Sequence, residues 1–218
     1  MCWCAGVGDS TGLGANLAYT LDDIDWDAIA AADHIHLGGT EMLGPDFATR
    51  ILKHARENGL TTSVDLIAPG GMGTFDLIAP AMAYTDYLLP NKEQVLGFTG
   101  AADIADGCRR LLDAGAGLLA VTCGADGALV VSHEGTQQVP AFAVDVVDTT
   151  GCGDAFSAGF VHATRIGRTP RDAAVLGNAD AALVAGGLGS DHGGFDLAAA
   201  DAFAASSVQV GEDLAGGF

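Results

Sequence analysis

The stretch "DTTGCGDAFSAGF", residues 148–160, decides the fold and the chemistry that this chain is expected to have. Gly151, Cys152 and Gly153 form a turn, Asp154 follows them, and a helical pattern then begins. Peptide N–H groups at the start of a helix have no partner inside the helix, and the helix dipole makes that end positive. The stretch therefore predicts that the backbone of this turn forms a cradle for an anion.

Asp154 has two interpretations. A carboxylate in the first turn of a helix stabilises the helix dipole, and this alone would explain the residue. An ionised carboxylate beside an anion cradle also suits the transfer of a phosphoryl group to an alcohol. The carboxylate would accept the hydroxyl proton, while the amides would stabilise the transferring group. The residues of the stretch do not decide between a helix cap and a catalytic base.

The composition predicts one domain over residues 1–218, because a chain of 218 residues can bury a continuous core. Hydrophobic residues make up 49% of the chain, but no run of about 18 apolar residues marks a membrane-spanning helix. The opening "MCWCAGVGDSTG" lacks the basic and apolar regions of a secretion signal. The five cysteines, which include Cys2 and Cys4, are scattered, so we expect reduced thiols, a cytoplasmic protein and no membrane partner.

The net charge is −19 at pH 7, with 28 acidic residues against nine lysines and arginines. The acids are spread along the chain rather than gathered in a tail. Such a field repels the phosphates of nucleic acids, so we do not expect nucleic acid as a partner. An anionic ligand must therefore be held by local backbone dipoles and bound cations, against the field of the whole chain.

Segments typical of strands and helices alternate along the chain. Apolar, β-prone runs predict strands at residues 34–39, 60–67, 86–90 and 117–123. Periodic or capped stretches predict helices over residues 45–58, 75–83, 101–114, 153–166 and 170–186. Two tight-turn signals predict a β-meander over residues 124–142 at one edge of the sheet. Repeated units of this kind predict an α/β fold with a mostly parallel sheet and helices on both faces.

Residues 148–156, "DTTGCGDAF", resemble the C-terminal signature D-T-x-G-[A/C]-G-D-x-F of the PfkB (ribokinase-like) family of carbohydrate kinases. The resemblance implies that Asp154 is the catalytic base and that the backbone of residues 151–153 is its anion hole. It also implies that Asp148 and Thr150 border a site for a monovalent cation such as K⁺.

The stretch "LLPNKEQVLGFTG" resembles the P-N-x-x-E segment of the same family, which positions Mg²⁺ and the phosphates of ATP. Asn91 matches the asparagine of that segment. Gln94 stands at the place of the glutamate, and Glu93 precedes it. The resemblance leaves open which of the two residues takes the role on the metal side.

The stretch "VTCGADGA" resembles the T-x-G-x-x-G turn that lies beside ATP, which implies that Thr122, Gly124 and Gly127 contact the nucleotide. Asn178 matches an asparagine near the nucleotide base. The loop 186–194 resembles the segment that closes the adenine pocket.

The resemblance covers about residues 14–195 and lacks the N-terminal part of the family, with its G-G-x-x-x-N sugar motif and lid. It implies a three-layer ribokinase-like sandwich that is N-terminally incomplete. The implied activity is that of a carbohydrate kinase, which transfers the γ-phosphoryl group of ATP to a hydroxyl of a sugar or sugar-like substrate. ATP, Mg²⁺ and a small-molecule sugar are the implied ligands, and an oligomer is compatible with the resemblance. Two alternatives stay open: a non-catalytic nucleotide-binding remnant and a nucleoside kinase of the adenosine type.

Overall fold

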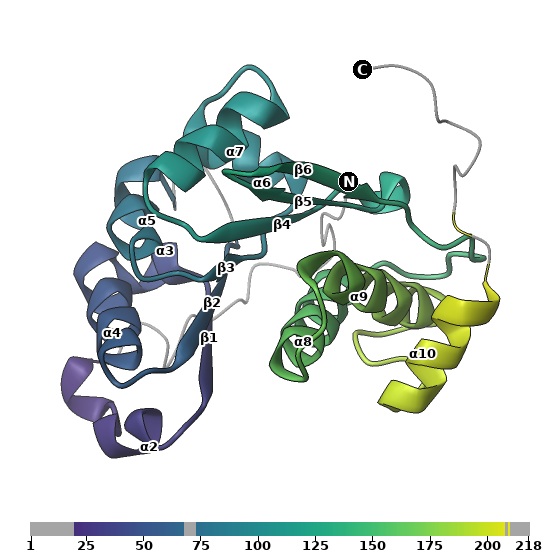
Figure 1. Cartoon of the computed structure of the whole chain (residues 1–218), viewed down its shortest axis with the longest axis horizontal. Helices are drawn as coiled ribbons and strands as arrows, with labels where there is room; N and C mark the ends of the chain where they lie inside the picture. The colour runs from purple at the N-terminus through teal and green to yellow at the C-terminus, as the bar shows by residue number, and fades with distance from the viewer. Residues whose placement is uncertain (1–19, 68–72, 208, 210–218) are drawn as a thin grey trace, which may run out of the picture. The chain divides into compact units, whose positions relative to one another are not determined.

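The alternation of strands and helices builds a six-stranded sheet with the order β1-β2-β3-β4-β5-β6 (Figure 1). This computed structural model describes residues 20–67, 73–207 and 209. The first four strands pair in parallel. The strands are β1 (His34–Gly38), β2 (Thr61–Asp65), β3 (Tyr87–Leu88), β4 (Leu118–Thr122), β5 (Ala128–Ser132) and β6 (Gly135–Val139).

The helices of the described residues precede, connect or follow these strands. They are α2 (Trp26–Ala30), α3 (Thr40–Leu43), α4 (Pro45–Glu57), α5 (Phe75–Met82), α6 (Lys92–Thr99), α7 (Ile104–Asp113), α8 (Cys152–Arg165), α9 (Pro170–Ala185) and α10 (Leu197–Ser206), with 3-10 turns η1 (Leu21–Asp23) and η2 (Gly124–Asp126). In this part of the chain, no helix is long and apolar enough to cross a membrane.

The predicted α/β fold with a mostly parallel sheet is confirmed. Each predicted strand and helix has its counterpart, and β5 and β6 form the predicted meander, with β6 last in the strand order. Helices α2, α3, α6 and α10 were not predicted. Cys2 and Cys4 lie outside the described residues.

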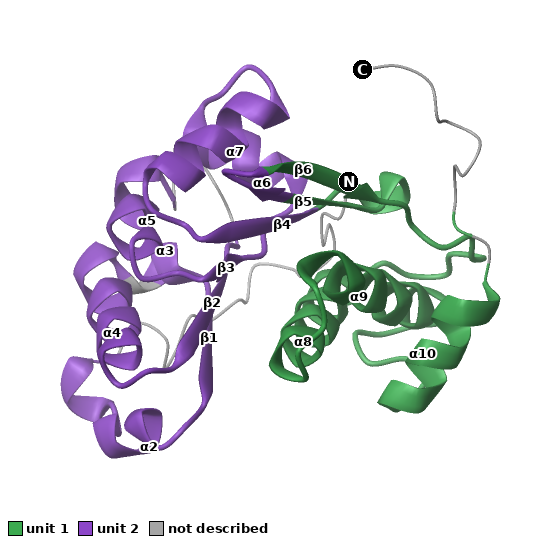
Figure 2. Ribbon diagram, in the orientation of Figure 1, with its two compact units in different colours: residues 1–4, 122–130, 135–218 green, residues 5–121, 131–134 purple. Residues whose placement is uncertain are grey.

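The chain groups into two units (Figure 2). Unit 1 takes residues 122–130 and the described residues from 135 onward, and unit 2 takes the described residues up to 121 together with residues 131–134. The residues of the quoted turn belong to unit 1, whereas Asn91 and Glu93 belong to unit 2. The single domain expected over the whole chain stays a prediction.

Helix α4 shows how unit 2 is built from its sequence. Gly44, with φ 84°, lets the chain enter the helix, and Pro45 stands in its first turn, where its missing N–H costs nothing. The apolar face of the helix packs on β1 and β2, and Leu52 in this face is fully buried. Burial of one such leucine contributes about 1.5–3 kcal/mol, so this face holds the helix on the sheet.

In unit 1, α8 and α9 pack closely because glycines stand where the two helices meet. A Cβ atom added to Gly159 of α8 would lie 2.3 Å from Oδ2 of Asp180, and one added to Gly177 of α9 would lie 2.8 Å from Phe156. Side chains at these two positions would force the helices apart. The pairing of α8 with α9 matters for function because α8 carries Asp154 in its first turn.

Asp180 is a partly buried acid in this helix pair. Its Oδ1 atom is buried and has no hydrogen-bond partner among the described residues. Burial raises the pKa of Asp180 to about 6, and the negative charge of Asp201 adds to the rise. Asp201 itself accepts two hydrogen bonds from Arg168, at 2.7 and 2.6 Å, which tie α10 to the turn between α8 and α9.

We expect Asp180 to make unfolding depend on pH. The pKa of Asp180 is about 6 in the folded chain, against an ordinary pKa of 3.8 for an aspartate carboxyl, so the native state binds more protons between these values. The free energy of unfolding therefore falls as pH rises from about 4 to about 6. Asp180→Asn should remove this fall, and it should be more stable than the parent by about 1–2 kcal/mol at pH 7.5, since the carboxyl is only partly buried.

Urea unfolding of the parent and of Asp180→Asn at pH 4.5 and pH 7.5 measures this difference. Asp113→Asn, at an exposed acid that ends α7, controls for the change in net charge. A stability difference between the parent and Asp180→Asn that is the same at both pH values would show that Asp180 titrates normally.

Candidate active site

The quoted turn starts α8 through a left-handed residue. Gly151 has φ 81° and ψ −5°, a conformation that a residue with a Cβ rarely adopts, and the helix begins at the next residue, Cys152. Asp154 lies in the first turn and is exposed, as the catalytic interpretation requires. No side chain in the described part of the chain caps this end of the helix.

The backbone amides of the turn divide into two groups. The amide of Cys152 donates to the carbonyl of Thr149 at 3.2 Å, and the amide of Ala155 donates to Gly151 at 2.9 Å, which is the first hydrogen bond of the helix. The amides of Gly153 and Asp154 lie between them and have no acceptor among the described residues. These two donors, at the positive end of the helix dipole, can bind an anion.

The space around Gly153 is open. A Cβ atom added to this glycine would have no heavy atom within 4 Å, and its φ is not in the left-handed region. The fold of the described residues therefore does not require glycine at this position. A ligand that approaches the amide from outside would require it.

Asp148 stabilises the start of the turn through three hydrogen bonds. Its Oδ1 accepts hydrogen bonds from the amide and the hydroxyl of Thr150, at 3.0 and 2.8 Å, and its Oδ2 accepts one from the amide of Gly189 at 3.2 Å. The backbone bond from Thr150 is the main reason why the pKa of Asp148 is lowered, so this carboxylate stays ionised. The carboxylate and the threonine hydroxyl both keep lone pairs, which fits the predicted monovalent cation.

The loop that follows α9 packs against the same turn. A Cβ atom added to Gly151 would lie 2.4 Å from the carbonyl oxygen of Ser190. The amides of Val147 and Asp148 donate to the carbonyl of Ala185, at 2.8 and 3.3 Å. The sequence pattern did not reveal these contacts, because they join residues about forty positions apart.

The turn predicted beside the nucleotide has left-handed glycines at Gly124 (φ 61°) and Gly127 (φ 85°), directly after Thr122 at the end of β4. A Cβ atom added to Gly127 would lie 2.1 Å from the carbonyl oxygen of Val139. Asn178 is buried, and its Nδ2 donates to the carbonyls of Val139 and Pro140 at 3.1 and 3.0 Å. Gly127 and Asn178 thus both hold the end of β6. Their contact with a nucleotide stays a prediction.

In unit 2, Asn91 caps α6 and forms a capping box with Gln94. Gln94 is buried, whereas Glu93 in the first turn of the same helix is exposed. Glu93 is therefore the acid of this segment that a metal could reach, and Gln94 does not fit that role. The spacing N-x-x-Q is itself a capping-box signal, so the part that Gln94 plays in the fold could have been predicted.

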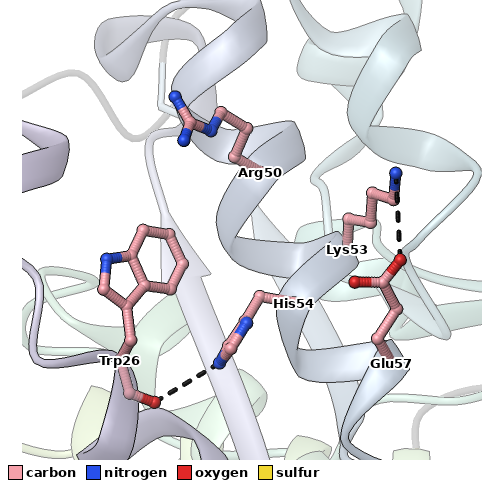
Figure 3. A pocket seen from close by; sticks show the side chains of 5 residues that line it. All are labelled: Trp26, Arg50, Lys53, His54 and Glu57. Atoms are coloured by element: carbon pink, nitrogen blue, oxygen red, sulfur yellow. Dashed lines mark hydrogen bonds and ion pairs between the residues drawn. The ribbon is translucent and has the colours of Figure 1, made fainter.

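A surface concavity of about 320 Å³ lies elsewhere in unit 2 (Figure 3). Its lining residues come from α2 and α4, and they are Trp26, Arg50, Lys53, His54 and Glu57. His54 Nε2 lies 3.3 Å from the carbonyl oxygen of Trp26, and Lys53 pairs with Glu57 at 3.8 Å. No predicted site residue lines this concavity. Within the described residues, no three His, Cys, Asp or Glu side chains form a group that could hold a metal.

Comparisons with known proteins match most of this chain. The model of the pfkB family carbohydrate kinase matches residues 9–193. An ATP-dependent ribose-1-phosphate kinase from Halopiger xanaduensis is 36% identical over 179 residues, which are 81% of this chain and 56% of that protein. Adenosine kinase from Saccharomyces cerevisiae is 30% identical over 168 residues, which are 69% of this chain and 49% of that protein.

The fold is similar to that of solved kinase structures. A ribokinase from Thermotoga maritima superimposes with a TM-score of 0.75 and 25% identity, covering 87% of this chain and 62% of that structure. The chain spans about half the length of the curated relatives that it matches. The family match includes the exposed Asp154, the open amides of the turn and the stretches around Asn91 and Thr122. The chain therefore belongs to the pfkB family of carbohydrate kinases.

Proposed function

We propose that this chain transfers the γ-phosphoryl group of ATP to a hydroxyl group of a sugar or sugar-like substrate, with Asp154 as the catalytic base. One observation carries the proposal: an exposed carboxylate and two amides without acceptors lie in the same first turn of α8. The space over Gly153 is open, so a ligand can reach these amides from solvent.

The side chain and the backbone of the turn have different roles in the proposed reaction. Asp154 takes the proton of the attacking hydroxyl, and the amides of Gly153 and Asp154 stabilise the negative charge on the transferring phosphoryl group. Mg²⁺, when it is bound, neutralises charge on the phosphates. Glu93 is the side chain proposed to face this ion, and Asp148 and Thr150 are proposed to hold a monovalent cation.

The remaining predicted residues would hold the nucleotide. Thr122 and Gly124 supply a tight backbone turn without a bulky side chain, which suits close contact with ATP. Gly127 and Asn178 would support this surface from the end of β6, where both lie. The predicted adenine-closing loop is held to the catalytic turn by the hydrogen bond between Gly189 and Asp148.

Two matched relatives support a ribose-containing acceptor. A ribose-1-phosphate kinase and an adenosine kinase both match, so ribose-containing acceptors are the first to test. The five cysteines, scattered along the sequence, support a cytoplasmic location. The charge of −19 supports small-molecule partners rather than nucleic acid.

A nucleotide-binding protein without catalytic activity is the second candidate. It is favoured by Gln94, a buried neutral amide at the place where the family signature has a glutamate. Calorimetry with ATP and Mg²⁺, beside a product assay with a panel of sugars and nucleosides, separates the two. Nucleotide binding without any phosphorylated product would favour this second candidate.

Asp154→Asn should lower turnover by about 10²–10⁴-fold, the usual effect of losing a general base. The affinity for ATP should change little, because the amides of the turn stay in place and the side chain keeps its volume. Steady-state kinetics with the best acceptor of the panel and calorimetry with ATP measure the two effects. A variant that phosphorylates the acceptor as fast as the parent would refute Asp154 as the base.

Gly153→Ala should affect stability and turnover in opposite directions. Alanine favours a helix over glycine by about 0.5–1 kcal/mol, and no described atom obstructs the added methyl group, so the thermal midpoint should rise. Turnover should fall by at least tenfold, because the methyl group occupies the space of the phosphoryl group.

Ala158→Gly, on the exposed side of α8, is the matched control for Gly153→Ala. It should lower stability by a similar amount and leave turnover unchanged. Full activity of Gly153→Ala would mean that the anion does not bind over this amide.

A further inference from the structure

Four polar side chains of α4 lie along one side of the helix. Counted from the first of them, the others follow at three, four and seven positions, a spacing that places residues on one face. They are Arg50, Lys53, His54 and Glu57. Trp26 of α2 packs against this face, with its ring centroid 4.9 Å from that of His54 in an edge-on arrangement. All five line the concavity of unit 2, so a tryptophan and two cations share one opening on the surface (Figure 3).

The indole of Trp26 is held in place from α4. His54 Nε2 lies 3.3 Å from the carbonyl oxygen of Trp26, and because a carbonyl can only accept, this nitrogen carries a hydrogen. Asn58 Nδ2 lies 3.4 Å from the same nitrogen, but it donates to the carbonyl of His54 at 2.9 Å. The ring contact and the hydrogen bond therefore fix Trp26 on α4, which reduces the loss of entropy when a ligand binds.

The concavity has donors that lack acceptors. Arg50 is exposed, and it has no hydrogen bond or ion pair with any residue that the structure describes. The indole N–H of the half-buried Trp26 has no acceptor in the described part of the chain either. Lys53 pairs with Glu57 at 3.8 Å, but both side chains are more than half exposed, so this pair is weak. Donors without acceptors opposite them favour an anion as the ligand.

The charges at the opening favour an anion that carries one charge. Arg50 and Lys53 are positive and Glu57 is negative, so the lining has an excess of one positive charge when histidine is neutral. The whole chain has a charge of −19, so a second negative charge on the ligand would be repelled without a local cation to offset it. A carboxylate fits this balance, because a guanidinium can donate to both of its oxygens.

Trp26 also gives the opening an apolar wall. Aromatic rings pack on an indole face or against its edge, which stabilises the contact beyond the area that it buries. The volume of about 320 Å³ is at the lower end of the range for small-molecule sites. A single ring with a short acidic group suits this size.

We infer that this concavity binds a small aromatic carboxylate, with the carboxylate on Arg50 and the ring on Trp26. Lys53 adds positive charge beside the carboxylate. The site contains none of the residues proposed for phosphoryl transfer, so the inference does not depend on the proposed function.

NMR of the ¹⁵N-labelled chain, titrated with benzoate at constant ionic strength, tests the site. The chain has two tryptophans, so a Trp3→Phe background leaves one indole N–H resonance, that of Trp26. Benzoate should shift this resonance until it saturates. Benzamide keeps the ring without the charge and acetate keeps the charge without the ring, so each should bind at least about tenfold more weakly. The absence of a saturable shift with benzoate, or an equal affinity for either analogue, would overturn the inference.

Arg50→Gln should weaken benzoate binding about 10- to 100-fold, the usual effect of losing a hydrogen bond to a charged group, and should leave benzamide binding unchanged. Arg171→Gln, at an exposed arginine in the first turn of α9, is the matched control because it changes the net charge by the same amount. It should bind benzoate as the parent does. Equal losses in the two variants, or no loss in Arg50→Gln, would contradict a carboxylate contact at Arg50.

Trp26→Leu tests the ring contact, with calorimetry as the measurement because this variant lacks the indole resonance. Leucine keeps an apolar wall, so benzoate affinity should fall by only about 2- to 10-fold, the contribution of an aromatic pair. Benzoate should still bind more tightly than benzamide, since Arg50 remains, and a general loss of structure would not preserve this preference. Benzoate affinity equal to that of the parent would remove Trp26 from the site and contradict the inference.

Discussion

The left-handed turn at Gly151 is the constraint on which the site depends. Its φ of 81° turns the chain directly into α8, so that the helix starts without a side-chain cap and leaves two amides open. The turn is held from both sides, because Ser190 packs against Gly151 and Asp148 accepts the amide of Gly189. A donor set fixed in this way needs no rearrangement when charge develops on a bound phosphate, which is the main source of electrostatic catalysis.

The chain would bind a polyanion although its own charge is strongly negative. With a net charge of −19, the overall field opposes ATP, and the turn at the start of α8 offers neutral donors, the amides of Gly153 and Asp154. Such dipoles act over short distances, whereas salt screens the field of exposed acids beyond about 10 Å at 0.1 M. Local geometry can therefore outweigh the repulsion of the surface.

Much of the fold could be predicted, because many helices and strands have clear end signals and a clear separation of apolar and polar residues. Helix α4 has a proline at its start, Asn58 at its end and a clear apolar face, and β4 is an uninterrupted apolar run. Helix α10 reads "LAAADAFAAS" and shows no such contrast, so it was missed. Gly159 allows α8 to pack closely on α9, while its neighbour Ala158 is exposed.

The part of the candidate site that lies in one continuous segment could be predicted from the sequence. Contacts between residues far apart in the sequence could not. The turn before Asp154 is one continuous segment, so its chemistry can be derived from adjacent residues. The partner of Asn178 is a pair of carbonyls 38 and 39 positions earlier, which no local pattern reveals. NMR of the ¹⁵N-labelled chain tests the central claim most directly. A non-hydrolysable ATP analogue should shift the amide protons of Gly153 and Asp154 downfield, as new hydrogen bonds do. Binding of the analogue that leaves both resonances unmoved would contradict the account.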